Sequence, residues 1–114
     1  MKKLIMAILL SIAVPAIAQA KPATCQIEDS GKTIYKGKCN FDPQGNGSFY
    51  ISHPSFAKKL NFEGIMVWIE SKDQAVVQAT KLSGGASTWG EATRSQKEKA
   101  CWVGDWFKVC TWAQ

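Results

Sequence analysis

Hydrophobic and aromatic residues fall into short runs along this chain, and residues that favour turns lie between the runs. The runs are rich in β-branched and aromatic side chains and cover residues 33–41, 48–52, 65–69, 75–80, 101–103 and 107–112. Clusters of Gly, Asp, Asn, Pro and Ser separate them, for example at 42–47 and 83–85. This spacing predicts β-strands joined by turns. We therefore expect an all-β, mainly antiparallel fold, built as a small sandwich or barrel.

Two segments add detail to this pattern. Residues 55–60 place a capping-type serine before apolar residues, a pattern compatible with a helix of one or two turns at most. A helix this short is not stable alone, so we expect this segment to be a connection packed on the sheet, and we expect at most one short helix in the fold. Residues 65–69 are almost continuously apolar, which favours a strand covered on both faces.

The first 20 residues have the layout of a secretory signal peptide. A basic start at Lys2 and Lys3 precedes an apolar stretch over 4–14, and Ala18-Gln19-Ala20 supplies the small residues that a signal peptidase reads. The apolar stretch is shorter than the ~20 residues that span a bilayer, which argues against a membrane anchor. We expect cleavage after Ala20, which leaves residues 21–114 as a single β-rich domain that is periplasmic or secreted.

All four cysteines, Cys25, Cys39, Cys101 and Cys110, lie in this expected domain. An even number of cysteines in a small exported domain predicts two disulfides, for which three pairings are possible. Sequence order favours Cys25–Cys39 and Cys101–Cys110, because each pair brackets a plausible hairpin. The alternative is a zinc site, which the wide spacings and the single histidine, His53, argue against. We expect no metal.

The second of these pairings also sets the register of the last hairpin. If Cys101 and Cys110 oppose each other, Trp102 opposes Val109 on the other face of the hairpin. Residues 104–107 then form a four-residue loop, a common length for a hairpin.

Charge and candidate catalytic groups argue against two classes of function. The chain has 14 basic and 9 acidic residues, and removal of Lys2 and Lys3 leaves a net charge of +3 on scattered side chains. Nucleic-acid-binding proteins cluster their basic residues, so we expect no nucleic-acid partner. His53 precedes Pro54 and no serine lies in a G-x-S-x-G context, so we identify no catalytic residue and no cofactor, and expect no enzyme. A carboxylate pair that meets only in space remains the enzymatic alternative.

The tryptophans suggest where a partner would bind, since the chain has 5 of them and most lie near its C-terminal end. We expect Trp68 and Trp102 to pack in the core. Trp106 lies at a predicted hairpin tip, where burial is difficult, and an exposed tryptophan on a braced loop is a typical interface anchor. The candidate partner-binding residues lie in the loops 83–90 and 104–107 and are Ser87, Trp89, Gly104, Asp105, Trp106 and Phe107.

Several stretches resemble those of known proteins. The sequences W-G-E-A-T-R-S at 89–95 and A-C-W-V-G-D-W-F-K-V-C at 100–110 resemble those of small exported proteins from Gram-negative bacteria. In size, export, disulfide use and β-rich character, residues 21–114 resemble periplasmic lysozyme inhibitors and immunity proteins paired with peptidoglycan-targeting type VI secretion effectors. Ser30-Gly31 followed by Tyr35 also resembles the Ser-Gly-x-x-Tyr loop of one lysozyme-inhibitor family, with one additional residue between them.

The resemblance implies a periplasmic immunity protein or enzyme inhibitor. Such a protein blocks a cell-wall-targeting enzyme or toxin by inserting a rigid loop into its active site. Its partner would be a peptidoglycan-acting protein. The alternative is an exported glycan-binding or small-molecule-binding module whose exposed tryptophans contact the ligand.

Overall fold

The computed structural model describes residues 20–114, and the expected signal peptide lies outside the described residues except for Ala20. This part of the chain forms eight strands and one short helix. In chain order they are β1 (Lys21–Asp29), β2 (Lys32–Gly45), β3 (Ser48–Ser52), α1 (Pro54–Lys59), β4 (Phe62–Ser71), β5 (Gln74–Lys81), β6 (Ala86–Arg94), β7 (Cys101–Val103) and β8 (Phe107–Ala113).

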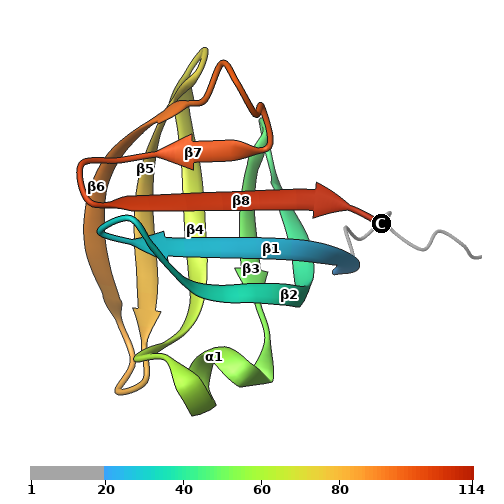
Figure 1. Ribbon diagram of the computed structural model, residues 1–114, viewed down its shortest axis with the longest axis vertical. Coiled ribbons are helices and arrows are strands. Elements are labelled where there is room, and N and C mark those ends of the chain that lie inside the picture. The colour runs from blue at the N-terminus through green and yellow to red at the C-terminus, as the bar shows by residue number, and fades with distance from the viewer. Residues whose placement is uncertain (1–19) are drawn as a thin grey trace, which may run out of the picture.

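The sheet closes on itself. Each strand pairs antiparallel with the next one along the chain, and β8 pairs with β1, so the strands form a closed barrel (Figure 1). Closure leaves no unpaired strand at an edge. The all-β antiparallel fold with one short helix is thereby confirmed, and of the two expected architectures the chain adopts the barrel.

Strand alternation sorts side chains between the barrel interior and its outer surface. In β1, Ala23, Cys25 and Ile27 are buried in the core, whereas Thr24 and Gln26 between them are only partly covered. Side chains on a strand point to opposite faces in turn, so one face of each strand fills the barrel. The inward-facing residues of the strands together form one continuous core.

Helix α1 covers one end of the barrel. The Nδ1 atom of His53 accepts a hydrogen bond from the backbone N–H of Ser55 (3.1 Å), which caps the helix, and Pro54 occupies its first turn. Phe56 is fully buried and meets the rings of Tyr35 and Phe62 edge to face, at centroid distances of 4.9 and 5.6 Å. The segment that we expected as a connection is therefore helical, with His53 rather than Ser55 at its N-cap, and its packing depends on Phe56. The expectation of at most one short helix is confirmed.

Both predicted disulfides are present, on opposite sides of the barrel wall. The Cys25–Cys39 bridge belongs to the core, with a Cα–Cα distance of 5.8 Å. Cys101 and Cys110 are directly opposed in the ladder, with a Cα–Cα distance of 4.0 Å, and Trp102 opposes Val109 as predicted. Two disulfides indicate an oxidising compartment.

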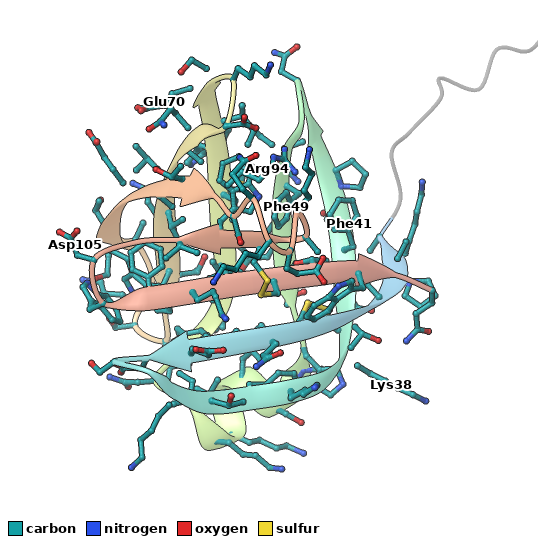
Figure 2. The ribbon with its side chains drawn as sticks, turned by 45° about the horizontal axis from the view of Figure 1, so that its top comes forward. Lys38, Phe41, Phe49, Glu70, Arg94 and Asp105 are labelled. Carbon is teal, nitrogen blue, oxygen red and sulfur yellow. A yellow bond between two sulfur atoms is a disulfide. The ribbon has the colours of Figure 1, made fainter. Side chains whose placement is uncertain are left out.

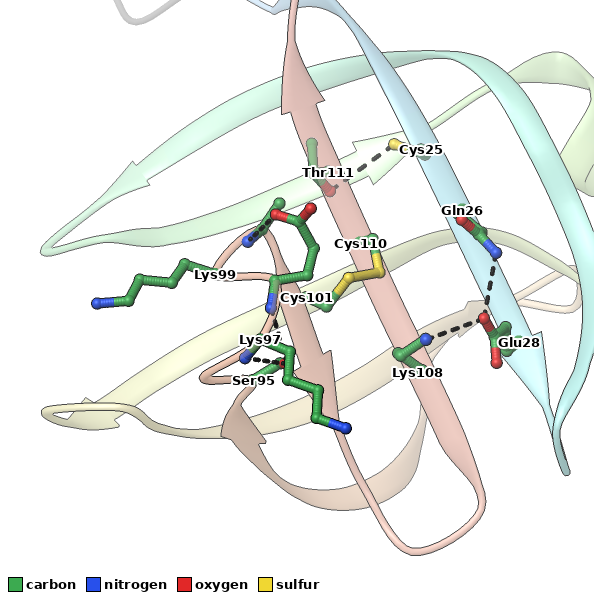
Figure 3. Close-up of a disulfide and its surroundings, with 12 residues drawn as sticks. Cys25, Gln26, Glu28, Ser95, Lys97, Lys99, Cys101, Lys108, Cys110 and Thr111 are labelled. Carbon is green, nitrogen blue, oxygen red and sulfur yellow. Dashed lines mark hydrogen bonds and ion pairs between the residues drawn. A yellow bond between two sulfur atoms is a disulfide. The ribbon is translucent and has the colours of Figure 1, made fainter.

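The Cys101–Cys110 bridge lies on the outer face of the barrel wall, since the neighbouring Trp102 and Val109 belong to the core. It is buried all the same, because the β6–β7 connection folds over it (Figure 3). Within that connection the Ser95 hydroxyl accepts hydrogen bonds from the backbone N–H groups of Lys97 and Glu98. The backbone N–H of Thr111 in β8 donates to the carbonyl of Ala100 (3.0 Å). No helix within residues 20–114 is long and apolar enough to cross a bilayer.

Two expectations about the strands are wrong. Trp68 is not in the core: its side chain is 45% exposed, because Ile65 and Val67 of β4 point inward and Trp68 follows the outward alternation. The segment 83–90 is not a loop throughout, since Ser87 and Trp89 lie in β6. Barrel closure requires a strand beside β5 at this position, and backbone pairing prevails over the low strand preference of the glycine at position 90.

Candidate functional site

An open cavity is lined by residues from several turns and strand ends of the barrel. Its volume is about 390 Å³. Trp89 of β6 and Trp106 of the β7–β8 loop form its aromatic wall, and we call it the tryptophan pocket. The remaining lining comes from the β1–β2 hairpin, the α1–β4 connection and the ends of β4, β5 and β6, as Asp29, Ile34, Leu60, Asn61, Phe62, Ala79, Lys81 and Ser87.

The loop that carries Trp106 is held in place at both ends. The backbone N–H of Ser30, in the β1–β2 turn, donates to the Trp106 carbonyl (2.6 Å), and that of Gly104 donates to the Phe107 carbonyl (2.8 Å). Gly104 is required by sterics, because a Cβ atom there would meet the ring of Phe107. The Trp106 side chain remains 39% exposed. The loop is therefore preorganised with a tryptophan at its surface.

Trp89 reaches the same cavity because β6 is irregular. Val77 pairs with Gly90 and Gln78 pairs with Thr88, so Trp89 is the additional residue of a β-bulge. Bulges re-aim side chains relative to the regular pleat. The result is a tilted contact between Trp89 and Trp106, with ring centroids 4.9 Å apart.

Behind the two tryptophans the aromatic contacts continue into the core. Phe107, 3% exposed, lies 5.6 Å from the Trp89 ring and 5.2 Å from the Trp106 ring, centroid to centroid. Phe62 lies 5.4 Å from Trp89 and links it to Phe56. Such edge-to-face and tilted pairs are favourable beyond the apolar area that they bury. The floor of the pocket is therefore rigid.

The predicted binding residues separate into two groups. Ser87, Trp89 and Trp106 line the tryptophan pocket together, although they come from two segments. Asp105 and Gly104 lie on the other side of the same loop, beside a shallower hollow of about 260 Å³ next to the β1–β2 turn. The buried ring of Phe107 also borders that hollow and supports the loop from within.

The sequence did not point to several other residues of the pocket. Asp29, Asn61 and Lys81 contribute a carboxylate, an amide and an ammonium group to it. They lie at the end of β1, in the α1–β4 connection and at the end of β5, which meet only when the barrel closes. No spacing or composition signal relates them to the tryptophans.

A second aromatic cavity, of about 220 Å³, lies elsewhere on the barrel, and we call it the arginine pocket. The Arg94 guanidinium lies 4.5 Å from the centre of the Trp102 ring, a cation–π contact. Phe41 and Phe49 stack beside it at 5.1 Å. Figure 2 shows Arg94, Phe41 and Phe49 together, on the opposite side of the molecule from Asp105.

In the arginine pocket, the Arg94 guanidinium already binds other groups of the protein. The Arg94 Nε atom lies 3.2 Å from a carboxylate oxygen of Asp73, and its Nη1 donates to the Lys99 carbonyl (3.0 Å). Trp102 is 2% exposed. These contacts tie the β4–β5 turn to the β6–β7 connection, which gives the pocket a structural role.

A larger hollow, of about 540 Å³, lies where the first described strand meets the last. Its lining begins at Lys21 and Pro22, ends at Gln114 and contains one aromatic ring, Phe41.

Within residues 20–114, no three His, Cys, Asp or Glu side chains lie close enough to hold a metal ion together. The concentration of aromatic and mixed polar groups therefore makes the tryptophan pocket the best candidate binding site.

Tyr35 lies outside the tryptophan pocket, and its phenol has a raised pKa. Burial raises the pKa of its phenol, because the ionised form would lose hydration, and the hydroxyl donates to the Lys38 carbonyl. Its ring packs against Phe56 rather than entering the pocket. We therefore assign Tyr35 to the aromatic framework.

We found no match to this chain among protein-family models, curated proteins or solved structures. The resemblance to lysozyme inhibitors and immunity proteins accordingly stays a prediction. Any function assigned to the molecule depends on the geometry of its site.

Proposed function

We propose that this protein is a periplasmic inhibitor or immunity protein that binds a cell-wall-acting enzyme or toxin and blocks its active site. One observation carries the proposal. Two segments distant in sequence, the β7–β8 loop and β6, converge to present Trp106 beside Trp89 on a braced barrel. The expected signal peptide and the two disulfides support an oxidising, extracytoplasmic location.

The β7–β8 loop has the properties of an inhibitory loop. Inhibitors bind well when their contact segment is already ordered, because less conformational entropy is lost on binding. Here the Cys101–Cys110 bridge closes the hairpin and the hydrogen bond from Ser30 to the Trp106 carbonyl holds its tip. Tryptophan is among the residues most enriched at interface hot spots. Trp106 is therefore the expected anchor, with Asp105 beside it as a charged neighbour.

Inhibition of peptidoglycan breakdown tests the proposal. Residues 21–114 are added to a muramidase, a lytic transglycosylase, an amidase and an endopeptidase, each acting on dye-labelled peptidoglycan. We expect stoichiometric inhibition of one class. Trp106→Ala should raise the concentration needed for half inhibition at least tenfold, a loss of about 1.4 kcal/mol.

Trp68 provides a matched control, since it is a similarly exposed tryptophan outside the pocket. Its indole N–H donates to the Gln78 side chain (3.1 Å) on the outer face of β4 and β5. Trp68→Ala should leave inhibition within about twofold of the native value. The proposal is wrong if a tenfold molar excess of the protein slows none of the four enzymes.

A further inference from the structure

We propose that the tryptophan pocket is also a binding site for a neutral saccharide, with a sugar ring packed against Trp106 and Trp89. This inference goes beyond inhibition of an enzyme and does not depend on it. It rests on the shape of the cavity, on the aromatic wall and on the polar groups around its rim.

The cavity has the position and size of a ligand site. Ligand sites recur in the mouths of β-barrels, and the tryptophan pocket lies among strand ends and connections of this barrel. The volume of about 390 Å³ falls within the ~300–1,000 Å³ typical of small-molecule sites. Leu60, the C-cap residue of helix α1, and Asn61 after it also line the cavity, so the end of the helix borders it.

The wall favours a ring with an apolar face. The two indoles of Trp89 and Trp106 are inclined at 52° to each other, and Leu60 and Ile34 complete the apolar lining. An aromatic face carries partial negative charge, which attracts the weakly positive C–H groups on one face of a sugar ring. The 39% exposure of Trp106 leaves part of its side chain free for this contact.

The rim favours hydroxyl groups over an anion. Asp29, Asn61, Lys81 and Ser87 supply both hydrogen-bond donors and acceptors, as sugar hydroxyls require. One carboxylate oxygen of Asp29 already accepts from the Ser30 hydroxyl (2.9 Å), which fixes the group and leaves its second oxygen to accept from a ligand. One acid and one base give the rim no net charge, so a neutral sugar fits better than a phosphate.

Titration with neutral disaccharides tests the site. N,N′-diacetylchitobiose, cellobiose and maltose are each added, up to about 20 mM, to ¹⁵N-labelled protein, a concentration that saturates a millimolar site. The indole N–H signals of Trp89, Trp106 and Trp68 are followed by NMR. We expect at least one sugar to shift the Trp89 and Trp106 signals saturably, while the Trp68 signal stays in place.

Two variants locate the binding. Trp106→Ala should weaken the sugar affinity at least tenfold, and Asn61→Ala, an exposed position, should weaken it about fivefold without unfolding the protein. The inference is overturned if no sugar shifts either pocket tryptophan, if the Trp68 signal moves equally, or if both variants bind as tightly as the native protein. Inhibition is measured separately, so either function can fail without the other.

Discussion

The two aromatic pockets of this barrel use similar residues in different ways. In the arginine pocket, the Arg94 guanidinium covers Trp102, and its hydrogen bonds go to Asp73 and to the Lys99 carbonyl. In the tryptophan pocket, Trp106 is held only through its backbone and by ring contacts, and its side chain remains well exposed. The first arrangement satisfies its polar groups internally. The second leaves an aromatic surface and a mixed polar rim open, which is what a binding site requires.

Stability should therefore depend on one pocket and binding on the other. The difference can be tested by substitutions in each, taken here from the largest expected effect to the smallest.

Trp102→Ala should give the largest effect. Trp102 is almost completely buried, and truncation of such a tryptophan costs about 3–5 kcal/mol in the free energy of unfolding. Urea denaturation followed by far-UV circular dichroism measures this cost. Trp106→Ala, the matched substitution in the other pocket, should cost less than about 1 kcal/mol. Equal costs would remove the distinction between the two pockets.

Removal of either disulfide should cost about 2–4 kcal/mol, since each closes a short loop. The two removals should differ in their effect on the β7–β8 loop. Replacing both Cys101 and Cys110 by Ala should speed hydrogen exchange at the Gly104 amide, because the hairpin loses its bridge. Replacing both Cys25 and Cys39 should change that exchange much less at the same global stability. Equally faster exchange at the Gly104 amide in both variants would show that the Cys101–Cys110 bridge does not brace the loop.

Arg94→Ala should cost about 1 kcal/mol, because its ion pair with Asp73 is partly exposed and its cation–π contact is of similar size. Asp73→Ala should cost about the same amount. A double-mutant cycle on the two substitutions measures their coupling energy. Additive costs would contradict the view that the pair ties together the β4–β5 turn and the β6–β7 connection.

The smallest effect should appear at alkaline pH. Burial raises the folded-state pKa of Tyr35 above its usual value, so folding favours the neutral phenol. Its contribution to stability is fully present below pH ~10, the unfolded pKa, and is lost as the pH rises through the folded pKa. Unfolding free energies measured from pH 8 to 11 should therefore fall less in Tyr35→Phe than in the native protein. A parallel fall in both proteins would exclude this role.

The features that sequence patterns predicted are the local ones. Strand alternation and the cysteine spacing act over a single hairpin, and the opposition of Trp102 to Val109 follows from them. Barrel closure acts over the whole chain, and the features that depend on it escaped prediction. Closure decides that Trp68 points outward from β4 and remains exposed, and that residues 86–94 pair as a strand.

The candidate site divides in the same way. Both tryptophans were named as candidate binding residues from the sequence. Trp106 lies at a predicted hairpin tip, and Trp89 lies in a glycine-containing segment predicted to be a loop. The rim groups Asp29, Asn61 and Lys81 belong to separate strand ends and connections, and only the closed barrel brings them together. Local chemistry in the sequence can therefore indicate an anchor residue, but the composition of a pocket depends on long-range pairing.

One comparison tests the central claim that the tryptophan pocket is the functional end of the molecule. Trp106→Ala and Arg94→Ala are assayed side by side for inhibition of the peptidoglycan-acting enzyme that the native protein blocks. We expect Trp106→Ala to lose at least tenfold in inhibition with nearly native stability. Arg94→Ala should keep inhibition within about twofold although it is less stable. The reverse result, with inhibition lost only in Arg94→Ala, would contradict the account.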